Sequence, residues 1–210
     1  MPDKQLNWKY TEELVVEPEI IQTTRQHALE LGVESVTPAT GAQLAVLAAA
    51  TRAESIIEVG TGVGVSGLWL LRGAPDAVLT TIDLESDHHQ VARRAFTDAG
   101  IPANRVRLIA GRAAEVLPRM NESSYDIAFI DADPASVIDY VGHGLRMVRR
   151  GGTVAVAHAL WRDRVADPAQ RDETTTTFRM LLTETSASDA VVSALSPVGD
   201  GLLLLTKTGD

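Results

Sequence analysis

The sequence predicts an α/β fold in which a seven-stranded, mostly parallel sheet carries helices on both faces. From about residue 53 onward, short apolar runs alternate with helical patterns, as in the crossover units of a parallel sheet. Residues 191–195 and 202–206 are strand-like runs joined by so short a link that they can pair only antiparallel. A glycine-rich turn joins the first apolar run to a helical pattern, which is typical of a ligand site at the end of a strand.

Each apolar run gives one expected strand, and helices are expected between them. The strands are expected at 55–59, 78–83, 106–109, 127–131, 153–157, 191–195 and 202–206. The helices are expected at 17–31, 40–50, 65–71, 87–99, 113–120 and 135–148. A chain of 210 residues is long enough for one well-buried domain, so we expect residues 1–210 to form a single unit. Within it, residues 1–50 would cap the ligand pocket or form a dimer surface, and residues 51–210 would be the ligand-binding core.

Composition and charge exclude several classes of function. The formal net charge of −9 argues against a nucleic-acid partner, which requires a basic surface. No window approaches the roughly 18 apolar residues of a membrane span, and residues 1–10 are too polar for a secretory signal. The absence of cysteine excludes disulfides, thiolate metal sites and thiol nucleophiles. We therefore expect a cytoplasmic protein that binds neither nucleic acid nor membrane.

Glycines at alternate positions, Gly60, Gly62 and Gly64, follow the first expected strand. They let the backbone bend sharply and let a ligand approach the main chain. Glu58, two residues before the first glycine, would repel a pyrophosphate and attract an ammonium or hydroxyl group. A dinucleotide-binding turn has its third glycine three residues after the second, where this chain has Val65. The turn favours a ligand with a cationic amino-acid end and a ribose, such as S-adenosylmethionine, although Glu58 could instead pair with a basic residue at the sheet edge.

Asp83 and Ser66 are further candidates for contact with such a ligand. Asp83 ends the second strand, about 20 residues after the glycine turn, where an acid can accept hydrogen bonds from both ribose hydroxyls. Its alternative role is that of a helix-capping or surface aspartate. Ser66 lies in the first turn of a helix, where its hydroxyl can reach a bound carboxylate or simply cap the helix. His88 and His89 fall early in the helix after Asp83, and we expect both to be solvated.

Acidic and histidine side chains follow the fourth and fifth strands. Asp131 and Asp133 come at the end of the fourth strand, in the crevice where such sheets bind ligands. They could hold a divalent cation, bind the cofactor or orient a substrate hydroxyl. Asp133 could also cap the helix that begins at Pro134. His158 follows the fifth strand and is a candidate base or metal ligand.

Five short motifs are found at residues 58–62 (EVGTG), 66–70 (SGLWL), 81–83 (TID), 129–133 (FIDAD) and 159–161 (ALW). Together they resemble the catechol O-methyltransferase-like family of S-adenosylmethionine-dependent O-methyltransferases, in its small bacterial branch. The resemblance implies the class I methyltransferase (Rossmann-like) fold. The resemblance also implies a role for each matching position. The methionine end of the cofactor would be held by Val36, Glu58, Gly60, Thr61 and Ser66, with Gly62 in the same turn. The ribose would lie between Asp83 and Leu84, and the adenine side would be near Arg112, Ala113, Ala114 and Asp133. Asp131 would face the metal or the acceptor.

The sequence departs from that family where the base and the metal are expected. The family has a lysine base at the position of Pro134, which cannot titrate, and Asp-Asn metal ligands where this chain has Ala157 and His158. Asp131 alone is a poor site for magnesium, which prefers several oxygen ligands. Asp131 with His158 could suit a softer transition metal. We therefore expect S-adenosylmethionine as the cofactor and a degenerate or absent divalent-metal site.

The leading hypothesis is an S-adenosylmethionine-dependent O-methyltransferase for a small hydroxylated acceptor, in which Asp131 or His158 handles the acceptor proton. A second hypothesis is a non-catalytic S-adenosylmethionine-binding protein, a sensor or an assembly partner, because Pro134 and Ala157 remove groups that the family's chemistry uses. A third is an NAD-dependent oxidoreductase, which the glycine turn disfavours. The first two expected helices carry more apolar residues than a thin cap needs, which predicts a homodimer: Ile20, Ile21, Leu29, Leu31, Leu44 and Leu47.

Overall fold

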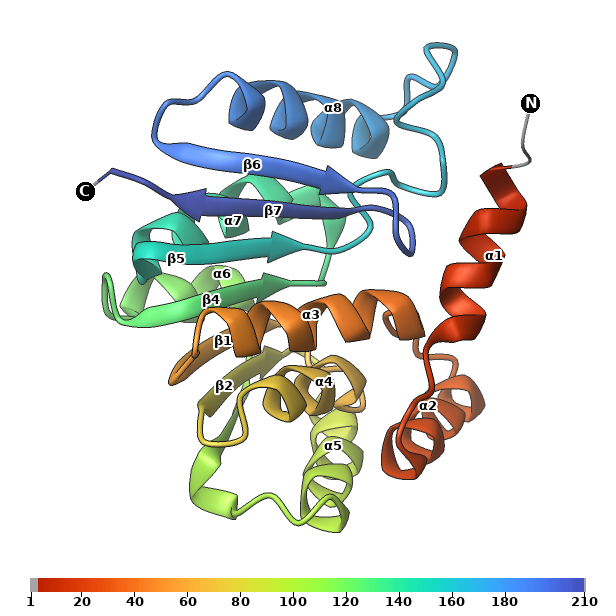
Figure 1. Cartoon of the computed structure of the whole chain (residues 1–210). Helices are drawn as coiled ribbons and strands as arrows, with labels where there is room; N and C mark the ends of the chain where they lie inside the picture. Colours follow the sequence, from red (N-terminus) through yellow and green to blue (C-terminus); the bar gives the residue numbers. More distant parts are fainter. Residues whose placement is uncertain (1–3, 210) are drawn as a thin grey trace.

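Seven strands form one mixed sheet in the computed structural model, which describes residues 4–209 (Figure 1). The strands are β1 (Ser55–Val59), β2 (Val78–Asp83), β3 (Val106–Ala110), β4 (Tyr125–Ile130), β5 (Val148–Val156), β6 (Val191–Ser196) and β7 (Leu202–Lys207). The helices are α1 (Lys4–Leu14), α2 (Glu19–Leu31), α3 (Pro38–Ala50), α4 (Val65–Gly73), α5 (Ser86–Asp98), α6 (Ala113–Val116), α7 (Val137–Met147) and α8 (Glu173–Ser186).

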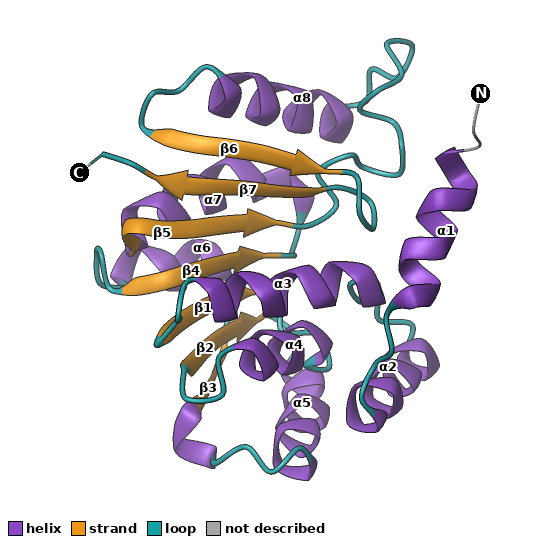
Figure 2. Ribbon diagram, viewed as in Figure 1, coloured by secondary structure: helices purple, strands orange, loops and turns teal. Residues whose placement is uncertain are grey.

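The strand order is β3-β2-β1-β4-β5-β7-β6 (Figure 2). Strands β1 to β5 pair in parallel, and β7 runs antiparallel to both of its neighbours, β5 and β6. The class I methyltransferase fold with its antiparallel hairpin at the end of the chain is thus confirmed. Several boundaries differ from the expectation; among them, β5 begins at Val148 rather than at residue 153, and Asp131 follows β4 rather than ending it.

Helices α1 and α8 were not expected from the sequence. Helix α8 contains four consecutive threonines, which have low helix propensity. It is stabilised instead by the Asp172 cap and by burial of Phe178 and Leu181. The apolar residues of α1 are largely exposed, so they show no buried face, but its Glu12 carboxylate accepts a hydrogen bond from the Ala39 N–H at the start of α3 (2.9 Å). The contact between Glu12 and Ala39 joins residues 27 positions apart, so local patterning does not reveal it.

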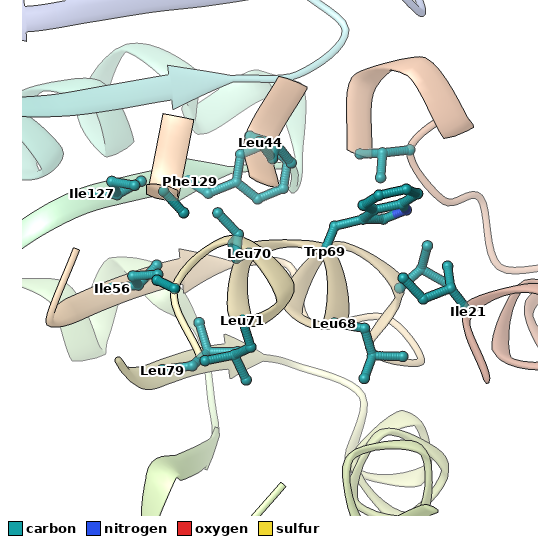
Figure 3. Close-up of a cluster of buried hydrophobic side chains, with 14 of the residues drawn as sticks. Ile21, Leu44, Ile56, Leu68, Trp69, Leu70, Leu71, Leu79, Ile127 and Phe129 are labelled. Atoms are coloured by element: carbon teal, nitrogen blue, oxygen red, sulfur yellow. The ribbon is translucent and has the colours of Figure 1, made fainter. Parts of the chain in front are cut away.

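Alternate residues of the central strands face opposite layers of helices. Ile56 packs with residues of α2 to α5, whereas the next residue, Ile57, packs with residues of α6, α7 and α8. Figure 3 shows the first cluster, in which Leu44 and Leu70 lie beside Phe129. Each fully buried side chain of this size contributes about 1.5–3 kcal/mol. Because β1 to β5 run parallel, the loops that follow them gather at one edge of the sheet.

Helix α3 belongs to the core, although the sequence suggested a cap or a dimer surface for this part of the chain. Leu44 and Ala48 are fully buried, and α3 packs along α4. The segment between α2 and α3 is fixed by Arg25, which donates hydrogen bonds to the Glu17 carboxylate (2.6 and 2.9 Å) and to the Val36 carbonyl (2.6 Å). Within residues 4–209, no helix combines the length and apolar character that a bilayer crossing requires.

Candidate functional site

A cavity of about 560 Å³ lies at the carboxyl ends of β1, β2, β4 and β5. Its volume falls within the range of about 300–1,000 Å³ that is usual for small-molecule sites. The site residues that the sequence predicts, except Glu58, line it: Val36, Gly60, Thr61, Gly62, Ser66, Asp83, Leu84, Arg112, Ala113, Asp131, Asp133 and His158. The fold therefore gathers residues that are far apart in the sequence around one cavity.

Gly60 brings the glycine turn close to the end of β4. Its φ of +96° lies in the left-handed region, and a Cβ at this position would overlap the carbonyl oxygen of Asp131. The Gly60 N–H donates to the Ile82 carbonyl (2.9 Å), and the Asp131 N–H donates to the Val59 carbonyl (2.8 Å). The ends of β1, β2 and β4 are thereby tied together beneath the cavity, and only a glycine fits at their junction.

Asp83 shapes the glycine turn as well as lining the cavity. Its Oδ2 accepts a hydrogen bond from the Gly62 N–H (2.8 Å), and its Oδ1 accepts one from the Glu85 N–H (2.9 Å). His88 also lines the cavity, with its Nδ1 4.0 Å from Asp83 Oδ1. His89 is buried, which lowers the pKa of its imidazole, and its Nε2 has no hydrogen-bond partner among the described residues. The expectation of a solvated side chain is wrong for His89, whereas the His88 side chain is partly exposed at the cavity.

Glu58 lies behind the cavity wall, with 0% of its surface exposed. Its Oε1 accepts a hydrogen bond from the Ser66 hydroxyl (2.6 Å) and its Oε2 accepts one from the Thr81 hydroxyl (2.6 Å), which in turn lies 2.6 Å from the Thr61 hydroxyl. Burial raises the pKa of Glu58 to about 7, although the two hydrogen bonds oppose this rise. Its partners are hydroxyls rather than a basic residue at the sheet edge. Glu58 thus adjoins the cavity through Thr61 and Ser66, and its direct contact with a ligand stays a prediction.

Asp131 and His158 meet at the acceptor side of the cavity. His158 Nε2 lies 3.5 Å from Asp131 Oδ1, and His158 Nδ1 lies 3.5 Å from Asp200 Oδ2. Either contact becomes an ion pair when the imidazole is protonated. Burial raises the pKa of the Asp131 carboxyl; His158 opposes this rise and Glu34 adds to it. The sequence analysis missed Asp200, which lies in the link between β6 and β7.

The remaining wall contains a helix cap and aromatic rings. Asp133 Oδ1 accepts a hydrogen bond from the Ala135 N–H (3.0 Å), so its expected capping role is confirmed, and the Tyr140 hydroxyl donates to its Oδ2 (3.1 Å). The Trp161 ring stacks on Phe178, with centroids 5.6 Å apart. Tyr140 and Trp161 both line the cavity. Sequence patterning did not identify Tyr140, because its place at the cavity depends on how α7 packs against the sheet.

The residues after β4 and β5 do not fit a divalent-metal site. Asp131 offers a carboxylate, but Pro134 and Ala157 have no donor atom in their side chains. Both imidazole nitrogens of His158 face carboxylates. Across residues 4–209, no group of three or more histidine, cysteine, aspartate or glutamate side chains is placed to hold a metal ion. Since hard cations prefer several oxygen ligands, this donor set offers too few.

Comparisons with known proteins agree with the geometry. A family model described as O-methyltransferase matches residues 9–208. A Mycobacterium ulcerans protein, whose name marks it as an inferred O-methyltransferase, is 48% identical over 199 residues, which are 94% of this chain and 89% of that protein. A structure from Corynebacterium glutamicum has a TM-score of 0.89 at 28% identity and covers 98% of this chain and 97% of its own. The O-methyltransferase TomG of Streptomyces achromogenes, involved in tomaymycin synthesis and solved with S-adenosylmethionine, has a TM-score of 0.85 at 27% identity, with both chains fully covered.

Proposed function

Because this chain belongs to the O-methyltransferase family, we propose that it transfers a methyl group from S-adenosylmethionine to a hydroxyl group of a small acceptor. The resemblance expected from the sequence motifs is confirmed by this membership. The non-catalytic and NAD-dependent alternatives lose their support. One observation carries the proposal: the glycine turn and Asp83 line the same cavity as Asp131 and His158. A methyl donor and an acceptor can therefore lie side by side.

The donor side of the cavity fits S-adenosylmethionine, which supplies an electrophilic methyl group when it is bound. Each Asp83 carboxylate oxygen accepts one backbone hydrogen bond and keeps a further lone pair, so the carboxylate can also accept the ribose hydroxyls. We assign Gly60, Gly62, Thr61, Ser66 and Val36 to the methionine end, and Leu84, Arg112, Ala113 and Asp133 to the nucleoside end. This assignment is supported by their shared place in the cavity wall.

The acceptor side must hold a hydroxyl group and take its proton. His158 has an imidazole nitrogen close to Asp131, so the imidazole can accept the proton while the carboxylate orients the hydroxyl. Trp161 and Tyr140 provide flat walls, which favour an aromatic acceptor. The side chains at the acceptor side offer too few metal-ligating atoms for a divalent cation. We therefore propose that the protein's own side chains, rather than a bound metal, activate the hydroxyl.

A methylation screen of phenols and carboxylic acids, with and without a chelator, tests this proposal. We expect activity that survives the chelator, and a fall in kcat of about 10²-fold or more in His158→Ala, as for loss of a general base. Asp131→Ala should also lower kcat. His27→Ala, which changes an exposed histidine of α2, is the matched control. The assignment is wrong if both site variants retain full activity, and cofactor binding without any product would favour the non-catalytic alternative.

We further propose a cytoplasmic homodimer. Leu29 and Leu31 of α2 are exposed, as are Leu6, Tyr10 and Leu14 of α1, and α1 extends from the end of the molecule to which β4 and β5 point (Figure 1). Ile21 and Leu44, also expected at a dimer surface, are buried in the core instead. Light scattering after size-exclusion chromatography tests the proposal, and a monomer at micromolar concentration would contradict it.

A further inference from the structure

We propose that Asp200, in the loop between β6 and β7, is a positioning residue that holds His158 for proton transfer. The inference rests on the proposed function, in which His158 accepts the proton of the acceptor. Asp200 lies outside the five motifs that carry the family resemblance. It reaches the site only because the hairpin at the end of the chain folds back beside the end of β5.

The imidazole of His158 spans two carboxylates, one at each ring nitrogen. Nδ1 lies 3.5 Å from Asp200 Oδ2, and Nε2 lies 3.5 Å from Asp131 Oδ1. Each carboxylate favours a ring proton on the nitrogen that it faces, but Asp200 is the one that a backbone N–H group holds in place. The ring proton therefore stays on Nδ1, beside Asp200, which leaves Nε2 as the nitrogen that can take a second proton. Nε2 is the one that faces Asp131. The two carboxylates would then stabilise the imidazolium that forms.

Asp200 is itself fixed by the turn that carries His158. Its carboxylate oxygens accept hydrogen bonds from the Arg162 N–H (2.6 Å each), and its backbone carbonyl accepts one from the Leu160 N–H (2.8 Å). The carbonyl of Gly201 accepts another from the Ala159 N–H (2.9 Å). The hairpin loop and the turn after β5 therefore form one hydrogen-bonded unit, so the Asp200 carboxylate has little freedom to leave the imidazole.

The backbone of this turn points to a constrained arrangement. His158, Trp161, Arg162 and Asp163 all have φ between +46° and +60°, a region that side-chain-bearing residues seldom adopt. Such conformations persist only where surrounding contacts hold them in place. The Asp200 contacts with Arg162 supply part of that support. The left-handed conformation at His158 in turn sets where the imidazole lies relative to Asp131.

A purely structural role for Asp200 predicts something different from a positioning role. If Asp200 only stabilised the turn, its replacement would lower stability and leave the imidazole tautomer unchanged. If it positions His158, Asp200→Asn has a defined effect. An amide oxygen in the place of Oδ1 keeps one of the two contacts with the Arg162 N–H, whereas an NH₂ group in the place of Oδ2 loses the other and faces Nδ1. The imidazole proton would then move to Nε2, and the nitrogen on the acceptor side would lose its free lone pair.

Nitrogen-15 chemical shifts of the histidine rings distinguish the two roles. The chain has five histidines, and the His158 signals are assigned by their loss in His158→Gln. At a pH where His158 is neutral, we expect the proton on Nδ1 in the wild type and on Nε2 in Asp200→Asn. With an acceptor from the screen, kcat of Asp200→Asn should fall about a hundredfold or more while the KM for S-adenosylmethionine stays nearly constant. Asp189→Asn, an exposed aspartate just before β6, should change neither the tautomer nor kcat.

The chemical shifts test the role of Asp200 even if Asp200→Asn fails to fold, because the tautomer of His158 is also measured in the wild type. A wild-type proton on Nε2 would overturn the role of Asp200. An unchanged tautomer and a kcat within about twofold of wild type in Asp200→Asn would do the same. Full turnover by His158→Gln would instead contradict the proposed base, so the failure of one proposal can be told from the failure of the other.

Discussion

Replacing Glu58 by glutamine should change how the stability of the protein depends on pH. The Glu58 side chain is fully buried and accepts hydrogen bonds from Ser66 and Thr81, and burial raises its pKa from 4.5 to about 7. A glutamine has nearly the same shape. Its oxygen can accept from one hydroxyl, and its NH₂ group can donate to the other. The variant therefore keeps the packing and removes the titration.

The expected magnitude follows from the difference between the two pKa values. The rise from 4.5 to about 7 is about 2.5 pH units, and each unit corresponds to about 1.4 kcal/mol, so the full effect is roughly 3–4 kcal/mol. Because the folded pKa is the higher one, the stabilisation is fully present below pH 4.5 and is lost as the pH rises through 7. Between pH 4.5 and pH 8.5, Glu58→Gln should gain about 3 kcal/mol in unfolding free energy relative to the wild type.

Urea denaturation of both proteins at half-unit pH intervals measures this difference. Glu54→Gln is the matched control, because Glu54 is exposed just before β1 and should give the same pH profile as the wild type. The reasoning fails if the free-energy difference between Glu58→Gln and the wild type stays constant across this pH range. A constant difference would mean that Glu58 titrates alike in the folded and unfolded chains, despite its burial.

Two further substitutions test the cofactor side of the cavity. Asp83→Asn removes one of the two oxygen acceptors for the Gly62 and Glu85 N–H groups and weakens the ribose contact. The Kd for S-adenosylmethionine, measured by calorimetry, should therefore rise about tenfold or more. An unchanged Kd would mean that Asp83 does not contact the cofactor. Gly60→Ala places a Cβ against the Asp131 carbonyl and should lower Tm by about 5 °C or more, whereas Gly142→Ala, at an open position of α7, should leave Tm equal or higher.

The positions of most strands could be predicted because β1, β2 and β4 are buried apolar runs bounded by turn residues. The start of β5 could not be predicted from the sequence. Arg149, Gly151 and Gly152 have the composition of a turn, yet they belong to β5. The Asp126 carboxylate accepts a hydrogen bond from Arg149 Nε (2.6 Å) and so holds this segment beside β4, where the pairing register shifts. A contact between residues 23 positions apart decides the structure here, and local composition contains no sign of it.

The methyl-donor side and the acceptor side of the cavity differ in how far the sequence reveals their residues. The donor side is built largely from one strand–turn–helix unit and the strand beside it, so its residues recur at fixed short spacings and the sequence reveals them. The acceptor side joins Asp131, His158 and Asp200, which follow three different strands and meet only when the sheet is complete. Glu58 shows a second limit: the sequence did not reveal that its carboxylate is buried and accepts hydrogen bonds from Ser66 and Thr81. Sequence motifs therefore reveal the methyl-donor side of the cavity. The arrangement of the acceptor side, where the proton is transferred, depends on long-range packing.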